Sequence, residues 1–268
     1  MPRLLRHHRS TTVPADTGKD KADAMFDADP TSCALFLDID GTLIDIAPSP
    51  DSVAIPPGLA ALIEGLTGAL GGALAVLTGR AIDEVDRFLA PLTPVAAGIH
   101  GAELRISRGG EVEFTAEPID PPVIEAVKDV MRAEPGVFVE LKRASIAVHY
   151  RLAPDAGPRI ELALQGVVGE SHDHLILCKG RKVLEIMPRH ISKGAALERI
   201  IDLPAFRGRR PIMIGDDVSD LSAFASAERL GGRGLKVSGG EYTADEATFH
   251  NPTEVREWLM ALVRRQEA

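Results

Sequence analysis

The chain has 268 residues, of which 45% are hydrophobic and 26% charged, and its net charge at pH 7 is −9. These values are typical of globular proteins and exclude a wholly disordered chain. The apolar runs are interrupted well before the roughly 18 residues that cross a bilayer, which argues against a membrane protein. A sequence pI of about 5.4 and the lack of a basic stripe argue against nucleic acid as a partner. The length allows one large domain or two smaller ones.

The cysteines and the N-terminal stretch indicate a cytoplasmic protein without disulfides. Cys33 and Cys178 stand in apolar stretches and lack a second residue at metal-ligand spacing, so we expect buried free thiols. Residues 1–30 begin with the basic sequence MPRLLRHHRS and continue polar, without the apolar segment of a secretory signal. We interpret residues 1–30 as a disordered tail.

From Cys33 onward, short apolar runs alternate with stretches of helical periodicity. Strands that are apolar throughout and alternate with helices are typical of a parallel sheet covered on both faces. The pattern therefore predicts a doubly wound, Rossmann-like α/β core, to which we assign residues 31–116 and 190–268. The runs are CALFLDID, GALAVLTGR, PVAAGIHG, RPIMIGDD and RGLKVS.

The segment at 117–189 has a different pattern. Helices are predicted from Pro122 to Arg132 and from about Arg159 to Val168. Each is followed by two runs with strand-like alternation, and VFVELK and SIAVHYR form a predicted hairpin. This αββαββ order suits an antiparallel sheet with helices on one face, so we predict a smaller α+β cap domain inserted into the core.

Two aspartates follow the first predicted strand, in the sequence LFLDIDGTL. Asp38 and Asp40 lie two residues apart, which places both carboxylates on one side of an extended backbone. Two like charges this close need a proton or a cation between them. Because ligands of open α/β sheets bind at the carboxyl ends of strands, the pair is a candidate catalytic site. An acidic turn or helix cap would explain one of these aspartates but not both.

A second acidic cluster follows the run RPIMIGDD. Asp216, Asp217 and Asp220 offer the small number of hard oxygen ligands that Mg²⁺ prefers, so we predict Mg²⁺ as the cofactor. Asp216 is the strongest ligand candidate. Asp217 or Asp220 also suits the N-terminal cap of the next helix, and that role is compatible with a metal site.

Two further groups stand where they could hold a phosphoryl group. Thr78, Gly79 and Arg80 follow an apolar run, and Lys193 opens a helix. A hydroxyl and an ammonium group both bind phosphoryl oxygens, and the lysine would offset the charge of an anionic substrate. Taken alone, such a threonine is usually a cap and such a lysine is usually solvated.

The chain resembles the haloacid dehalogenase superfamily in four elements that occur in the same order. They are DxDGT, a strand-end threonine, a distant lysine and GDDxxD. The resemblance implies that Asp38 attacks phosphorus and that Asp40 protonates the leaving oxygen and then activates water. It implies a Mg²⁺ site at Asp216 and Asp38 with the carbonyl of Asp40, and phosphoryl contacts from Thr78 and Lys193. Residues 217 and 220 would support the metal.

A narrower resemblance, to the trehalose-6-phosphate phosphatases, covers nearly all of residues 33–262. In that family the cap closes over the site and reads the sugar. The resemblance implies that Glu140, Lys142 and Glu185 bind the hydroxyls of the distal glucose. The motifs that carry it are LFLDIDGTL, Ile46-Ala47-Pro48, LTGR, Gly98 to Glu103, Glu140-Leu141-Lys142, His149-Tyr150-Arg151, Gly180 to Pro188 and GDDxxD.

Five more residues complete the expected substrate site. Gly79 and Arg80 belong to LTGR, His100 and Glu103 belong to GIHGAE, and Arg181 belongs to the motif from Gly180 to Pro188. Without the resemblance to the family, we would interpret His100 as a histidine of a turn. We would interpret Glu140 and Lys142 as an ion pair on a solvated strand face.

The sequence departs from the family at two positions. Arg181 stands where a lysine is common, and Leu221 replaces the last acid of GDDxTDE. These departures keep a second hypothesis open, namely a capped phosphatase for a different glycosyl phosphate. Two further hypotheses are a non-catalytic phosphosugar sensor and a phosphomutase. We expect a monomer whose partner is a sugar phosphate.

Overall fold

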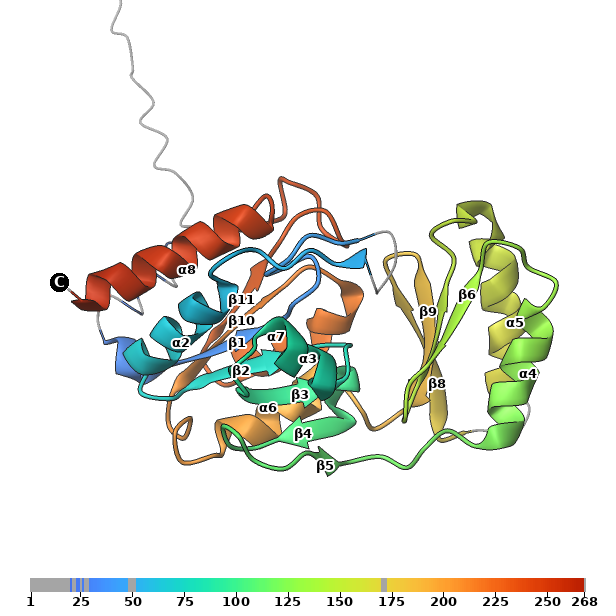
Figure 1. Ribbon diagram of the computed structural model, residues 1–268, viewed down its shortest axis with the longest axis horizontal. Helices are drawn as coiled ribbons and strands as arrows, with labels where there is room; N and C mark the ends of the chain where they lie inside the picture. Colours follow the sequence, from blue (N-terminus) through green and yellow to red (C-terminus); the bar gives the residue numbers. More distant parts are fainter. Residues whose placement is uncertain are drawn as a thin grey trace, which may run out of the picture.

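The structure is a computed structural model that describes residues 20, 23, 24, 26, 29–47, 52–169 and 173–267. Its strands form two separate sheets, and each sheet has its own apolar core. In Figure 1 the larger sheet lies on the left and the smaller sheet stands beside it on the right. The predicted parallel sheet and the predicted second antiparallel sheet are both confirmed.

The larger sheet has the strand order β11-β10-β1-β2-β3-β4-β5. The strands from β11 to β3 are parallel, and β4 and β5 join them antiparallel. All five residues of β1 are buried, as expected for a central strand covered on both faces. The bounds are β1 Cys33–Leu37, β2 Leu74–Leu77, β3 Val95–Gly98, β4 Glu103–Arg105, β5 Glu113–Phe114, β10 Arg210–Gly215 and β11 Arg233–Lys236.

The antiparallel edge of this sheet was not predicted from the sequence. The chain reverses in the 3₁₀ turn Ile99–Gly101, which connects β3 directly to β4. Because β4 and β5 have only three and two residues, neither is long enough to show strand periodicity.

Helices cover both faces of the larger sheet. The connection from β1 to β2, which contains α2, and the connection from β10 to β11, which contains α7, run toward opposite edges of the sheet. Because such crossovers between parallel strands are right-handed, α2 and α7 lie on opposite faces. α8 packs against α2, and α6 packs against α7 (Figure 1). The strand order reverses between β1 and β10, and a crevice for ligands forms at such a point. The bounds are α2 Leu59–Ala69, α3 Ile82–Phe88, α6 Lys193–Ile201, α7 Leu221–Arg229 and α8 Pro252–Glu267.

The smaller sheet is antiparallel, with the order β6-β7-β9-β8. Its two helices, α4 and α5, pack against each other on the face that is turned away from the larger sheet (Figure 1). The two predicted helices and the predicted hairpin are confirmed. The bounds are α4 Pro121–Met131, β6 Phe138–Leu141, β7 Ile146–His149, α5 Gly157–Gly169, β8 Leu175–Gly180 and β9 Val183–Pro188.

Alternation along β7 and β9 gives the smaller sheet two different faces. Ile146 and Val148 are fully buried in the core beneath α4 and α5. The residues between and after them, Ala147 and His149, line a cavity on the other side, as does Glu185 of β9. The period of two therefore separates the side chains that stabilise this sheet from those available for a ligand.

The cysteines are free, as predicted, but only Cys33 is fully buried. Cys178 is partly exposed because β8 is an edge strand of the smaller sheet. Among the residues that the structure describes, none of the helices combines the length and apolarity needed to cross a membrane.

Most of the predicted tail, residues 1–30, lies outside the described residues. Its described part includes Phe26, whose buried ring packs edge-on against Trp258 of α8. The indole Nε1–H of Trp258 also donates to Asp23, at 2.9 Å. Asp23 and Phe26, within this stretch, thus contact α8.

Truncation of the core of the smaller sheet should destabilise the protein. Ile186 of β9 is fully buried, so Ile186→Ala should lower the free energy of unfolding by about 2–5 kcal/mol in urea titrations. The matched control is Leu162→Ala on the exposed face of α5, where we expect a change below about 0.5 kcal/mol. Equal effects of the two substitutions would contradict the assigned packing.

Candidate active site

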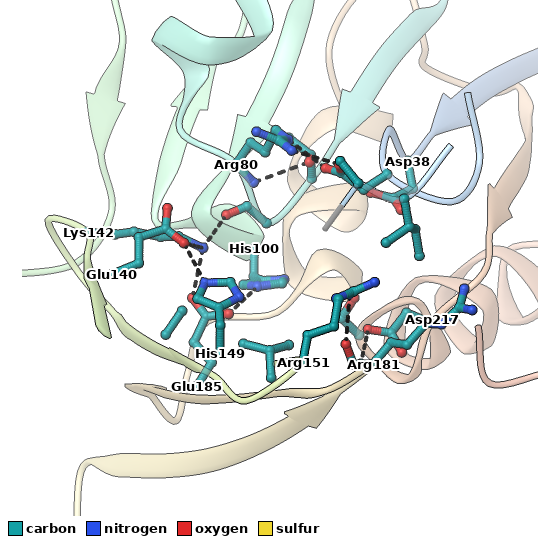
Figure 2. Close-up of a pocket in the computed structure, with 18 of the residues that line it drawn as sticks. Asp38, Arg80, His100, Glu140, Lys142, His149, Arg151, Arg181, Glu185 and Asp217 are labelled. Carbon is teal, nitrogen blue, oxygen red and sulfur yellow. Dashed lines mark hydrogen bonds and ion pairs between the residues drawn. The ribbon is translucent and has the colours of Figure 1, made fainter. Parts of the chain in front are cut away.

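A cavity of about 290 Å³ lies between the two sheets and is lined by residues of both. The large sheet contributes the carboxyl ends of β1, β2 and β10, and the small sheet contributes β6, β7 and β9. In Figure 2, Asp38 and Arg80 lie on one side of the cavity, and Glu140, His149 and Arg151 face them from the smaller sheet.

A buried lysine bridges two carboxylates at the floor of the cavity. The Nζ of Lys193 donates to Oδ1 of Asp38 and to Oδ1 of Asp220, both at 2.7 Å. The other oxygen of Asp220 accepts the backbone N–H groups of Asp216 and Asp217, each at 3.0 Å. Both oxygens of Asp220 are therefore engaged, and this side chain orients the β10 loop and the lysine.

Asp38, Asp216 and Asp220 form a buried carboxylate cluster. One oxygen atom of each lies within 4.8 Å of the others. Asp216 fits here because the residue opposite it is Gly41, whose φ of 78° is left-handed and at which a Cβ would overlap the carboxylate of Asp216. The turn after β1 thus brings two acidic loops together at the point where the strand order reverses.

The cluster holds more negative charge than its lysine balances. Burial raises the pKa of Asp38; Lys193 opposes this rise and Asp220 adds to it. Burial and the charge of Asp38 likewise raise the pKa of Asp216. Burial alone would lower the pKa of Lys193, but the carboxylates of Asp220 and Asp38 outweigh burial and raise it, so the amine stays protonated. A divalent cation with oxygen ligands would relieve this excess charge.

Arg80 holds the second aspartate of the first motif. Its guanidinium donates to Asp40 through Nε at 2.6 Å and Nη2 at 2.8 Å, and to Glu84 through Nη1 at 2.9 Å. The guanidinium also lies over the ring of Phe88, at 4.8 Å from its centroid. Arg80 was predicted to bind substrate, whereas in this structure it binds Asp40.

The end of β2 places Thr78 and Gly79 at the cavity wall. Thr78 is 1% exposed, and its Oγ1 accepts the N–H of Arg80 at 3.2 Å. The carbonyl of Gly79 accepts from Nζ of Lys142 on the smaller sheet, at 3.0 Å. This hydrogen bond joins the two walls of the cavity.

The wall formed by the smaller sheet carries a hydrogen-bonded group of charged side chains. Oε2 of Glu140 accepts from Nε2 of His149 at 2.8 Å, and Nζ of Lys142 lies 3.4 Å from Oε1 of Glu185. Ser145 Oγ donates to Oε1 of Glu185 at 2.5 Å. Figure 2 shows Glu140, Lys142, His149 and Glu185 around the cavity, which all four line. Such groups can accept from and donate to vicinal hydroxyls.

Comparison with known proteins agrees with this geometry. Residues 36–250 match the model of the trehalose-phosphatase family. A probable trehalose-phosphate phosphatase of Sinorhizobium fredii is 41% identical over 82% of this chain and 83% of its own length. The trehalose-6-phosphate phosphatase of Escherichia coli is 34% identical over 84% and 85%, respectively.

The chain belongs to the trehalose-phosphatase family. This membership confirms the predicted resemblance and the predicted class of enzyme, a phosphoric monoester hydrolase. The fold agrees as well, because the C-terminal domain of the Candida albicans trehalose-6-phosphate phosphatase superposes with a TM-score of 0.75 at 19% identity. The match covers 87% of this chain and 93% of that one.

The structure brings most of the predicted site residues of this trehalose-phosphatase family member to the cavity. They are Asp38, Asp40, Thr78, Gly79, Arg80, His100, Glu140, Lys142, Arg181, Glu185, Lys193, Asp216 and Asp217. Asp220 lies just behind them, bonded to Lys193. Arg181 is in the β8–β9 turn, where its backbone N–H donates to Asp217 at 3.4 Å.

Glu103 is placed outside the cavity. Its Oε2 accepts the backbone N–H of Ile82 at 2.7 Å, at the start of α3. The sequence suggested a substrate contact because Glu103 shares a motif with His100, but His100 lies in the turn Ile99–Gly101 and lines the cavity, whereas Glu103 lies in β4 and contacts the start of α3.

Several cavity residues were not predicted. His149 and Arg151 line the cavity, and the only signal for them was their place in the motif His149-Tyr150-Arg151. Glu84 and Phe138 also line it, and neither gave a signal in the sequence. Their positions depend on the pairing of distant elements, which no local pattern encodes.

Removal of one carboxylate from the cluster should stabilise the cation-free protein. A carboxyl group whose pKa is raised by folding destabilises the native state at pH values above its unfolded pKa of about 4. Asp216→Asn should therefore raise the free energy of unfolding by roughly 1 kcal/mol or more at pH 8 in chelator-treated protein, and by less at pH 5. Urea titrations at the two pH values measure this, and a variant less stable than wild type at pH 8 would contradict it.

Loss of the Glu103 carboxylate should affect folding and not substrate binding. Glu103→Ala leaves the N–H of Ile82 without its buried acceptor, so the free energy of unfolding should fall by about 1–3 kcal/mol. The KM for a phosphate ester should stay unchanged at a temperature where the variant is folded. A raised KM together with wild-type stability would return Glu103 to the substrate site.

Proposed function

We propose that this protein hydrolyses trehalose 6-phosphate to trehalose and phosphate through an aspartyl-phosphate intermediate, with Mg²⁺ as the cofactor. The observation that carries the proposal is the arrangement of the two cavity walls. Asp38, held by Lys193, lies at the floor, and the hydroxyl-binding groups Glu140, Lys142 and Glu185 lie on the opposite wall. Membership in the trehalose-phosphatase family supports the choice of sugar.

The acidic cluster suits Mg²⁺. Asp38 and Asp216 would hold the ion together with the backbone carbonyl of Asp40, because these are hard oxygen donors. Asp217 stands beside them, and Asp220 orients the loop. When bound, the ion would neutralise charge on the phosphoryl oxygens and on the cluster.

In the first step, a carboxylate oxygen of Asp38 attacks phosphorus and the bond to the sugar oxygen breaks. Lys193 occupies Oδ1 of Asp38, which leaves Oδ2 as the attacking atom. Asp40, in its protonated form and separated from Arg80, gives its proton to the leaving sugar oxygen. Thr78 and Lys193 contact the transferring phosphoryl group.

In the second step, water attacks the aspartyl-phosphate. Asp40, now ionised, accepts the proton of that water, and phosphate leaves with the carboxylate of Asp38 restored. The guanidinium of Arg80 donates to both carboxylate oxygens of Asp40 and can orient the carboxylate for this step. Splitting the reaction into two displacements matters because phosphate monoesters hydrolyse extremely slowly without a catalyst.

We infer that residues 117–189 act as a cap that reads the sugar. Supporting this, the smaller sheet faces the carboxyl ends of β1 and β10 across the cavity. A phosphatase for another glycosyl phosphate is the alternative, since Arg181 and Leu221 differ from the family pattern. The retained Asp38, Asp40, Lys193 and Asp216 argue against a sensor. The monomeric state and the cytoplasmic location stay predictions.

The proposal is tested by phosphate release from trehalose 6-phosphate, glucose 6-phosphate and sucrose 6-phosphate, with and without Mg²⁺. We expect a strong preference for the trehalose ester, loss of activity with a chelator and recovery when Mg²⁺ is added. Asp38→Asn should lower the rate at least about a thousandfold, because it removes the nucleophile.

Asp129→Asn is the matched control, since this aspartate is exposed on α4 and should leave the rate unchanged. Preference for another ester would keep the mechanism and refute the sugar. Full activity in Asp38→Asn or without divalent cations would refute the mechanism.

A further inference from the structure

His100 and Glu185 connect the two sheets across the cavity. Nε2 of His100, in the 3₁₀ turn after β3, lies 2.9 Å from Oε2 of Glu185 on β9 of the smaller sheet (Figure 2). The exposed fractions of the two side chains are 13% and 9%. A hydrogen bond so well shielded from water is strong enough to fix the orientation of both groups.

The backbone at His100, where this contact is made, adopts an unfavourable conformation. Ile99 and His100 have φ angles of 46° and 57°, in the left-handed region that residues with a Cβ avoid. Two hydrogen bonds hold the turn: the N–H of His100 donates to the carbonyl of Thr78, and that of Ile99 to the carbonyl of Arg80, both at 2.9 Å. The turn is thereby fixed to the end of β2.

The imidazole then fits against a residue without a side chain. A Cβ at Gly79 would lie 2.8 Å from both Cε1 and Nε2 of His100, closer than real contacts allow. Because φ of Gly79 is not left-handed, its glycine is explained by the space that the ring needs and not by backbone freedom.

Donors already occupy most of the acceptor sites of Glu185. Burial alone would raise the pKa of Glu185, but Lys142 and His100 outweigh burial and hold it well below the usual range, so Nε2 of His100 is the donor. Ser145 and Lys142 donate to Oε1, and His100 donates to Oε2. A carboxylate has about four acceptor sites, so one remains on Oε2, beside the cavity.

We propose that His100 is a positioning residue for sugar recognition, which fixes the Glu185 carboxylate so that its remaining acceptor site meets a hydroxyl of the substrate. The inference rests on the proposed function of this cavity as a sugar-phosphate site. His100 acts through Glu185 and does not itself bind the sugar. Recognition of the sugar would then depend on contact between the two sheets, because His100 belongs to the larger sheet and Glu185 to the smaller one.

The test compares two substitutions of His100. Asn tolerates the left-handed backbone, but its amide is too short to reach Glu185; in Gln the amide nitrogen can occupy the position of Nε2. The measured quantity is the ratio of kcat/KM for the best sugar phosphate to kcat/KM for 4-nitrophenyl phosphate, an ester without a sugar. His100→Asn should lower this ratio about tenfold or more, through KM, and His100→Gln should restore most of it.

A purely structural role predicts a different result, because damage to the core would lower both kcat/KM values together. An unchanged ratio in His100→Asn, or equal losses in His100→Asn and His100→Gln, would overturn the inference. His190→Leu, a substitution of an exposed histidine after β9, is the control and should leave the ratio unchanged.

A double substitution tests whether His100 acts through Glu185. If it does, His100→Asn combined with Glu185→Gln should lower the ratio no further than Glu185→Gln alone. Losses that multiply would show independent roles and overturn the inference. A wild-type enzyme that prefers the aryl ester to every sugar ester would instead refute the proposed function.

Discussion

The buried amine of Lys193 is the interaction on which the rest of the site depends. It lies between Asp38, from the loop after β1, and Asp220, from the loop after β10, at 2.7 Å from each. These loops meet because β1 and β10 are neighbours in the sheet. Without a buried cation, two carboxylates could not remain ionised there, and Asp38 could not take the nucleophilic role that we propose for it.

The opposite wall follows a different principle. Its polar side chains are joined by a continuous set of hydrogen bonds. Ser145 and Lys142 bond to Glu185, and Glu185 bonds to His100 of the larger sheet. Such a set keeps each side chain in one orientation while leaving a few acceptor and donor sites for a ligand. The floor of the cavity thus suits an anion and a metal ion, and the opposite wall suits hydroxyl groups.

Much of this site could be predicted from local sequence patterns, and there are physical reasons why the rest could not. The pair Asp38 and Asp40 was visible because the period of a strand puts both on one side. The contact of Glu103 with the start of α3 could not be predicted, because it joins residues that are distant in the sequence. The contact of Arg80 with Asp40 could not be predicted either, because no local signal shows that Asp40 lies within reach of the guanidinium.

The parallel core, the second sheet and the acidic motifs could all be predicted from the amino-acid sequence, because periodicity and strand-end chemistry are local properties. The folded molecule was needed to show which oxygens are already engaged, as at Asp220, and which side chains meet across the cavity, as His100 and Glu185 do. These two residues are 85 positions apart in the chain. Their contact depends on how two sheets pack, and that depends on the shape of whole surfaces.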